Sequence, residues 1–466
     1  MARLKEELAE SRKLIAKLTK ERDELRARIS KNSSNSHKPP SSDTPDQRKT
    51  RNKDRTSRKD KKRKRGAQPG HPGHSRGFQP AEKVDEFFDY RPEACGKCGS
   101  TELNERDDLE PRRMQQVEIP VPKPLLHEHR QHAAECVDCG HLIWAELPKG
   151  VLNSSFGPGV HAQIALLTGA YNISRRNACK LMSELHGIDI SVGALSRCEE
   201  RMSEAVAPAV EEARDYVRCQ PVKNIDATGW LNQGQGRQAW ALVTPLVVAY
   251  FITADGTQAT VKQVVGKDSE GIMISDRATV FNFWAMDKRQ VCWAHLLRKF
   301  ISFAEMNGLA GMIGGELVRQ TQLMFHHWHL VCDGTMSRAA FQRLMAPKQQ
   351  WLEELLKYAV TCNIYGLSGS CQNVLDHRDA LWTFVGRQDV QPTNNAAERA
   401  LRQLVLWRKR SHGSQSERGE RFTERMLTTV ESLRVQERDV LSYLRAAIEN
   451  YSSHENPPSL LPDHGT

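Results

Sequence analysis

The chain has 466 residues, a formal net charge of +10 and 11 cysteines, which leaves room for about three domains. No run approaches the roughly 18 consecutive apolar residues of a membrane span, and the charged amino-terminal residues do not resemble a signal peptide. We therefore expect a cytoplasmic, multidomain protein with no membrane partner, whose cysteines are mostly free thiols.

Residues 1–31 carry a heptad pattern with charged residues beside the apolar positions. Roughly four heptads are near the minimum for a coiled coil. The pattern predicts a coiled-coil helix and hence a homo-oligomer, and the alternative is a single amphipathic helix packed on the protein itself. The positions of the pattern are Leu4, Leu8, Ser11, Ile15, Leu18, Arg22, Leu25 and Ile29.

Residues 32–82 are predicted to form a basic, disordered arm. Residues 1–80 hold 24 Lys and Arg against 10 Asp and Glu, a net charge of +14, whereas the whole chain has 67 against 57. The stretch from Arg48 to Arg65 contains 12 basic residues and no large apolar side chain, so it cannot bury a core. We expect it to neutralise DNA phosphates without sequence preference; the alternative is a solvated linker.

Residues 83–150 contain two Cys-x-x-Cys-Gly sequences, a pattern that predicts a zinc ribbon-like module. Four thiolates in two such turns suit tetrahedral structural Zn²⁺, although the 37 residues between the pairs exceed the usual spacing of about 15–20. A redox function would need only one pair and a thioredoxin-like unit, which the sequence lacks. His141 is a less favoured substitute ligand. The predicted metal ligands are Cys95, Cys98, Cys136 and Cys139.

Residues 151–217 have helical periodicity and resemble a helix-turn-helix. Ser174 and Ser191 are candidate N-caps, and Gly187 lies between the two helices. The second helix would present Ser196 and Arg197, with Ser191, to a DNA groove. A plain helical bundle explains the same pattern equally well.

Residues 218–300 alternate between strand and helix patterns. Apolar runs predict strands at 222–226, 239–243, 247–252, 271–275 and 290–293, with a helix near 257–265. This order predicts an α+β fold with a ribonuclease H-like core, in which the first and fourth strands are neighbours. A helical insertion would follow at 301–385, the rest of the core at 386–452 and a disordered tail at 453–466.

Three acidic residues mark the candidate active site. Asp226 and Asp276 follow apolar runs that read as strands, and Glu398 opens a helix. Carboxylates brought together in this way can hold two Mg²⁺ or Mn²⁺ ions for phosphodiester cleavage and transfer. Glu398 has a second interpretation: with Asn395 as N-cap it would complete a capping box, whereas with Thr393 or Asn394 as N-cap it would be free to bind metal.

Three segments resemble the insertion sequence 66 family of bacterial transposases, which are of the DDE type. They are Asp226–Trp230, Cys292–His295 with Arg298–Phe300, and Asn394–Arg402. The likeness covers most of the chain. The family usually has an acidic residue where Ala227 stands, Gly-Tyr where Arg277 and Ala278 stand, and an aspartate where Thr393 stands.

The resemblance implies a DNA transposase that cleaves element ends and transfers strands, with Asp226, Asp276 and Glu398 as catalytic metal ligands. It also implies small companion proteins of the element as partners. Basic residues near the glutamate are candidate contacts to the DNA backbone, namely Arg399, Arg402, Arg408, Lys409 and Arg410.

Two other function classes remain open on the sequence. One is a non-catalytic, zinc-containing DNA-binding regulator, and the other is a ribonuclease H-like nuclease without strand transfer. The histidines at 326, 327 and 329 are not spaced as one ligand face. Cys292 and His295 have the spacing of half a metal site, but packing is the favoured interpretation.

Overall fold

The computed structural model describes residues 12–15, 17–18, 21–22, 31–36, 43–44, 47, 77–106, 108–119 and 123–462. The chain divides into two units, one of residues 1–49 with 124–466 and the other of residues 50–123. The predicted coiled coil and basic arm fall largely outside the described residues; those described between 12 and 22 are helical and exposed. The described fold is α+β and contains two sheets.

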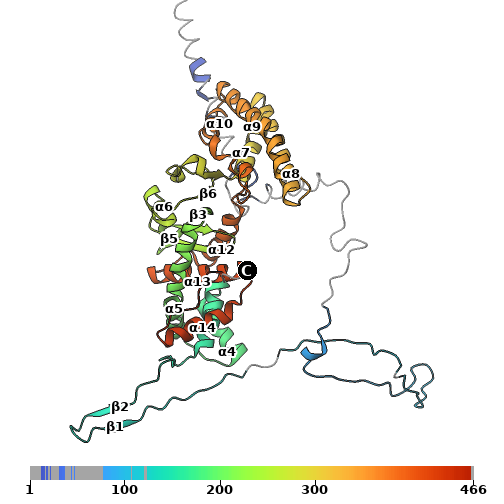
Figure 1. The fold of residues 1–466 in the computed structure, drawn as a ribbon, viewed down its shortest axis with the longest axis vertical. Coiled ribbons are helices and arrows are strands. Elements are labelled where there is room, and N and C mark those ends of the chain that lie inside the picture. The colour runs from blue at the N-terminus through green and yellow to red at the C-terminus, as the bar shows by residue number, and fades with distance from the viewer. Residues whose placement is uncertain are drawn as a thin grey trace, which may run out of the picture. The chain divides into compact units, whose positions relative to one another are not determined.

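A mixed five-stranded sheet organises the larger unit (Figure 1). Strands β3 and β4 form a long hairpin, β5 pairs antiparallel with β4, and β6 and β7 add on the other side in parallel with β3, which gives the order β5-β4-β3-β6-β7. The strands span Val222–Asn232, Gln235–Val243, Val248–Thr253, Ile272–Ser275 and Arg289–Val291. This order confirms that the first and fourth strands of the sheet are neighbours.

The two faces of the sheet bury different helices because side chains alternate along a strand. Ile225, Trp240 and Leu242 share one core with α5 (Val192–Cys219), α6 (Gln258–Val265) and α14 (Val440–Ser452). The opposite face, with Trp230 and Tyr250, packs against α12 (Asn395–Ser411). The end of the sheet at β6 and β7 belongs to a third core, formed with α7 (Trp293–Ala304) and the helices that follow it.

A helical insertion separates β7 from α12, as the sequence predicts. Its aromatic core includes Trp328, Phe341 and Phe384, whose ring centroids lie 5.3–6.0 Å apart. Its elements are α8 (Leu309–Cys332), α9 (Arg338–Thr361), α10 (Ser368–Leu375), η6 (Arg378–Ala380) and α11 (Thr383–Gly386). Two short turns, η4 (Thr279–Phe281) and η5 (Met286–Lys288), lie between β6 and β7.

The helices before the sheet begin and end where their sequence predicts. Ser174 caps α4 (Arg175–His186) by accepting a hydrogen bond from Asn177 N–H, Gly187 ends that helix at φ 63°, and Ser191 caps α5. They pack with α3 (Pro158–Ala165), which continues as the π-helical turn η3 (Leu166–Ala170). Ser196 on α5 accepts a hydrogen bond from Arg418, so this side chain faces another helix of the same protein.

Helix α13 (Glu417–Val435) lies against the free edge of β5. The amides of Val248, Tyr250 and Ile252 donate to the side chains of Ser432, Thr428 and Glu424 respectively. The three acceptors are four residues apart and therefore share one helix face. An edge strand whose amides are bonded in this way cannot pair with a further strand.

Two sequence predictions, one about the end of a strand and one about the carboxyl-terminal tail, were wrong. The first strand does not end at Asp226, because β3 continues to Asn232 through its pairing with β4. The tail that was expected to be disordered from residue 453 is packed as far as it is described: Leu460 is fully buried, and its carbonyl accepts a hydrogen bond from Gln436. The Leu460 side chain packs into the core that includes α14, and the polar composition of the tail did not predict this contact.

Candidate active site

The register of the parallel strands brings the two aspartates to one place. Val222, Lys223 and Asn224 of β3 pair with Ile272, Met273 and Ile274 of β6, a constant offset of 50 residues. Continued two residues beyond the last pair, this offset matches Asp226 with Asp276, which follows directly after β6. Because alternate residues share a face, Asp226 is on the face of Trp230, toward α12.

Glu398 reaches this face from α12. The helix presents Ala397, Ala400, Leu401 and Leu404 to the sheet, and the small alanines allow close approach. Its N-cap is Asn394, and Glu398 N–H donates to the Asn394 carbonyl at 3.1 Å. Glu398 is therefore the fourth residue of the helix, so the capping-box interpretation, which required Asn395 as N-cap, was wrong.

Asn394 fixes the helix to the strand that carries Asp226. Its side chain is fully buried, donates to the Ile225 carbonyl at 2.8 Å and accepts from Asn224 at 2.9 Å. Its backbone N–H donates to the Cys292 sulfur at 3.1 Å. One amide side chain thus connects β3 to the start of α12, while its backbone connects the same point to the start of α7.

The three carboxylates interact electrostatically. The pKa of Asp226 is raised from its ordinary 3.8 to about 7, chiefly by burial and to a smaller extent by the charges of Asp276 and Glu398, against the lowering effects of the Ala227 N–H and Arg298. Ionising all three acids together is therefore costly in the metal-free protein. A divalent cation removes that cost, and carboxylate oxygens are the ligands that Mg²⁺ and Mn²⁺ prefer, so this donor set fits either ion.

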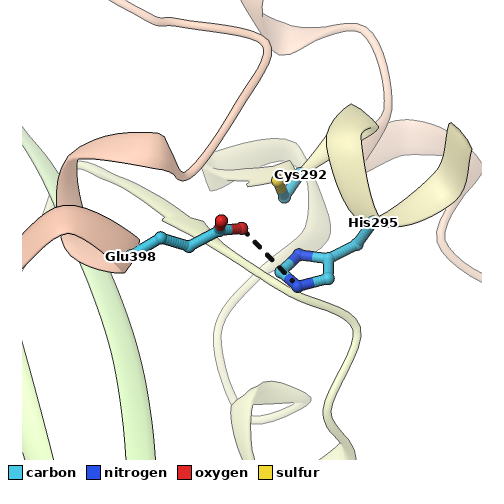
Figure 2. A group of neighbouring side chains, drawn as sticks. All are labelled: Cys292, His295 and Glu398. Carbon is cyan, nitrogen blue, oxygen red and sulfur yellow. Dashed lines mark ion pairs between the residues drawn. The ribbon is translucent and has the colours of Figure 1, made fainter. Parts of the chain in front are cut away.

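Two side chains of α7, those of His295 and Arg298, lie beside Glu398; His295 is drawn with Glu398 in Figure 2. His295 Nε2 lies 3.6 Å from Glu398 Oε1, and an Arg298 nitrogen lies 3.4 Å from the same oxygen. The Cys292 sulfur is close to both: among the described residues, Cys292, His295 and Glu398 form a group whose possible ligand atoms all lie within 4.8 Å of one another. The sequence alone favours packing for Cys292 and His295 and a catalytic role for Glu398.

A buried arginine holds the loop that carries Asp276. Arg289 on β7 is fully buried and donates to the Asp276 carbonyl at 2.6 Å, to Ser275 Oγ at 3.1 Å and to Asn282 at 3.1 Å. Arg277, one of the departures from the family pattern, donates to Asn373 of α10 at 2.7 Å. Sequence reasoning missed Arg289, since a single arginine in a short apolar strand carries no motif.

The predicted DNA contacts divide into two groups. Arg197, Arg399, Arg402 and Lys409 are exposed and available to a polyanion. Arg408 instead donates to the Gly229 carbonyl of β3, and Arg410 to the Tyr171 carbonyl at 2.9 Å. Both of these arginines hold elements of the protein together.

Each Cys-x-x-Cys pair forms the same turn. Cys95 N–H donates to the Ser100 carbonyl and Gly99 N–H to the Cys95 carbonyl, both at 2.8 Å. Cys136 and Gly140 repeat these bonds, at 2.9 and 2.8 Å, between β1 (Ala133–Glu135) and β2 (Leu142–Trp144). Gly99 and Gly140 have φ of 77° and 70°, which favours glycine. Hydrogen bonds to sulfur lower the pKa of Cys95 and Cys136, as suits thiolate ligands.

The other histidine cluster shows no metal geometry among the described residues. His327 Nδ1 hydrogen-bonds the Leu323 carbonyl at 2.6 Å, and its ring packs edge-on against His326 with centroids 5.5 Å apart.

No helix in the part of the chain that the structure describes is both long and apolar enough to cross a membrane.

Comparison with known protein families defines the class of this protein as transposases. The model described as Transposase IS66 family matches residues 153–421, more than half of the chain, and the chain therefore belongs to the IS66 family. Residues 2–77 match a second model, described as a family of unknown function (DUF6444). No curated protein matches the chain.

Proposed function

We propose that the protein is a DDE transposase that cleaves DNA at the ends of its element and transfers the freed strands to a target. The observation that carries the proposal is the parallel register of β3 and β6, which, continued, matches Asp226 with Asp276. It is supported by the pKa of Asp226, which burial and then the charges of Asp276 and Glu398 raise. The strand order β5-β4-β3-β6-β7 supports a ribonuclease H-like core, since it has the mixed order expected from the sequence.

Each acid has a distinct position in the proposed mechanism. Asp226, opposite Asp276, would contact both metal ions, and Asp276 and Glu398 would each hold one of them. Bound there, Mg²⁺ or Mn²⁺ would activate the attacking water or 3′-hydroxyl and stabilise the leaving oxygen. Arg298, which lies beside Glu398 and lowers the pKa of Asp226, would contact the scissile phosphate, and exposed Arg399 and Arg402 would bind the flanking backbone.

The test compares charge-removing variants of the three acids on cloned element ends. Asp226→Asn, Asp276→Asn and Glu398→Gln should fold, bind the DNA, and neither nick nor join it in Mg²⁺, because a neutral amide is a poor ligand for a hard cation. The matched control is Asp389→Asn, an exposed acid that should leave both reactions unchanged. Near-normal cleavage by any of the three variants contradicts the assignment.

The same assay separates the alternatives. A ribonuclease H-like nuclease would nick the ends without joining them to a target. A non-catalytic regulator would bind the ends and do neither, with or without the substitutions. Joined products made by the parent protein exclude both.

The amino-terminal parts add structural zinc and oligomerisation to the proposal. Cys95, Cys98, Cys136 and Cys139 would share one Zn²⁺, supported by their two matching turns, and the heptad pattern would join two or more copies. Elemental analysis should find one zinc fewer per chain in Cys95→Ser and in Cys136→Ser than in the parent. Equal zinc in the parent and both variants would rule the site out.

A further inference from the structure

We propose that Cys292, His295 and Glu398 form a second metal site, one for a thiophilic divalent cation such as Zn²⁺, which shares Glu398 with the catalytic carboxylates. Zinc binds thiolate, imidazole and carboxylate ligands, and with three protein ligands water would complete the tetrahedron. The site differs from the magnesium-binding set in its ligand chemistry, because sulfur and nitrogen select softer metals.

The geometry is close to that of a loaded site. Zinc bonds to these ligands are about 2.0–2.3 Å long, so tetrahedral ligand atoms lie roughly 3.3–3.8 Å apart. His295 Nε2 and Glu398 Oε1 are already 3.6 Å apart, and no pair in the group exceeds 4.8 Å. Small side-chain adjustments within the group would bring every pair into that range. In Figure 2 the Glu398 carboxylate points toward the His295 ring, from the opposite side of the group.

The backbone around Cys292 favours its thiolate once metal is bound. Cys292 is the N-cap of α7, where the helix dipole stabilises negative charge. Its sulfur also accepts the Asn394 N–H at 3.1 Å. In the metal-free protein burial raises the pKa of this thiol to about 11, so metal binding breaks the S–H bond and releases the proton to solvent.

A metal ion would enter the site beside Glu398, because this side chain is the most exposed of the three and carries negative charge. Its side chain is 30% exposed, whereas that of His295 is 11% exposed and Cys292 is fully buried. An ion that enters there takes the place of Arg298 beside the carboxylate. If the proposed function is correct, a thiophilic ion would compete with the catalytic ions for Glu398 and inhibit the enzyme; this competition rests on that function, whereas binding does not.

Cobalt titration of the full-length protein tests the site, because Co²⁺ bound to thiolate absorbs light by charge transfer and Zn²⁺ does not. Protein freed of metal by a chelator is titrated with Co²⁺. The parent should bind one equivalent more than Cys292→Ser or His295→Gln. The matched control is Cys371→Ser, another fully buried cysteine, which should bind as much as the parent. Glu398→Gln should weaken the extra site by more than the roughly tenfold typical of losing an outer-shell partner.

Equal cobalt binding by the parent and Cys292→Ser would overturn the proposal, and undiminished affinity in Glu398→Gln would overturn the sharing of the carboxylate. If Cys292→Ser does not fold, His295→Gln decides alone: the site is supported if it loses the equivalent and rejected if it does not. These readouts involve no DNA, so a failed cleavage assay and a failed metal site are distinguished.

Discussion

Asp226 couples the stability of the metal-free protein to pH. Its pKa is about 7 in the fold, chiefly because of burial, against an ordinary 3.8. A carboxyl whose pKa rises on folding binds more protons in the folded state between these values, so its contribution to stability falls as pH rises from about 4 to 7 and stays low above. Divalent metal ions bound to Asp226 should remove this loss of stability.

Asp226→Asn should therefore stabilise the metal-free protein at pH 8 and much less at pH 5. Each kcal/mol relieved corresponds to roughly 2–4 °C in melting temperature for a domain of this size. The measurement is thermal unfolding in a chelating buffer at several pH values, with Asp389→Asn as control. A difference between parent and Asp226→Asn that does not change with pH would contradict the burial of this charge.

Replacing Asn394 with Asp should lower stability and cleavage more than replacing its neighbour Asn395 with Asp, although the two substitutions are chemically identical. Asn394→Asp removes the donor to the Ile225 carbonyl and places a charge beside it, which should destabilise by about 1–3 kcal/mol and reduce cleavage by misplacing Glu398. Asn395 is exposed in the first helical turn, where an added aspartate is neutral or favourable. Urea unfolding and a cleavage assay of Asn394→Asp and Asn395→Asp check this. Equal stability and equal cleavage by the two variants would contradict the role of the Asn394 side chain in holding α12 to β3.

At the scale of residues, the sequence indicated candidate acids but not the groups that surround them. Asp276 directly follows β6 and Glu398 lies near the start of α12, as the apolar run and the helix start indicated, because strand ends and helix caps are local features. Asp226 lies inside β3, whose end the sequence placed too early. The association of Cys292 and His295 with Glu398 depends on a fold that brings together residues more than 100 positions apart, so a Cys-x-x-His spacing alone favoured packing. Arg289 is equally invisible, since only its burial beside Asp276 reveals its role.

At the scale of elements, the edge of β5 should depend on single hydroxyl groups of α13. Thr428 and Thr429 are both fully buried, but Thr428 Oγ1 accepts the Tyr250 N–H, whereas Thr429 Oγ1 has no hydrogen-bond partner among the described residues. Thr428→Val should cost about 1–3 kcal/mol by leaving a buried amide unpaired. Thr429→Val should be neutral or stabilising, because it removes an unpaired buried hydroxyl.

The pair is compared by urea unfolding, with tryptophan fluorescence as the readout. Similar losses in both variants would mean that α13 protects the edge by packing rather than by hydrogen bonds. The strands themselves were predictable from alternation and turn residues. The hydrogen bonds between α13 and the edge of β5 were not predictable, because Glu424, Thr428 and Ser432 look like ordinary polar positions of an amphipathic helix.

At the scale of the whole molecule, charge separates the amino-terminal arm from the rest. Residues 1–80 have a net charge of +14 while the whole chain has +10, so residues 81–466 sum to −4. A net negative body cannot attract DNA over long distances by itself. The arm should therefore supply most of the nonspecific affinity, through release of counterions from phosphates.

Replacing Lys61, Lys62, Arg63, Lys64 and Arg65 with Gln should weaken nonspecific DNA binding and flatten its salt dependence. Each lost phosphate contact lowers the slope of log affinity against log salt by about 0.9, so these five changes should reduce it by at most about 4.5. The matched control exchanges Arg63 and Arg65 for Lys; it keeps the charge and should keep the slope, because point charges suffice for counterion release. Binding to a random duplex is measured at several salt concentrations. An unchanged slope in the glutamine variant would place the nonspecific contacts on the body of the protein, with exposed Arg399, Arg402 and Lys409 as the first residues to test.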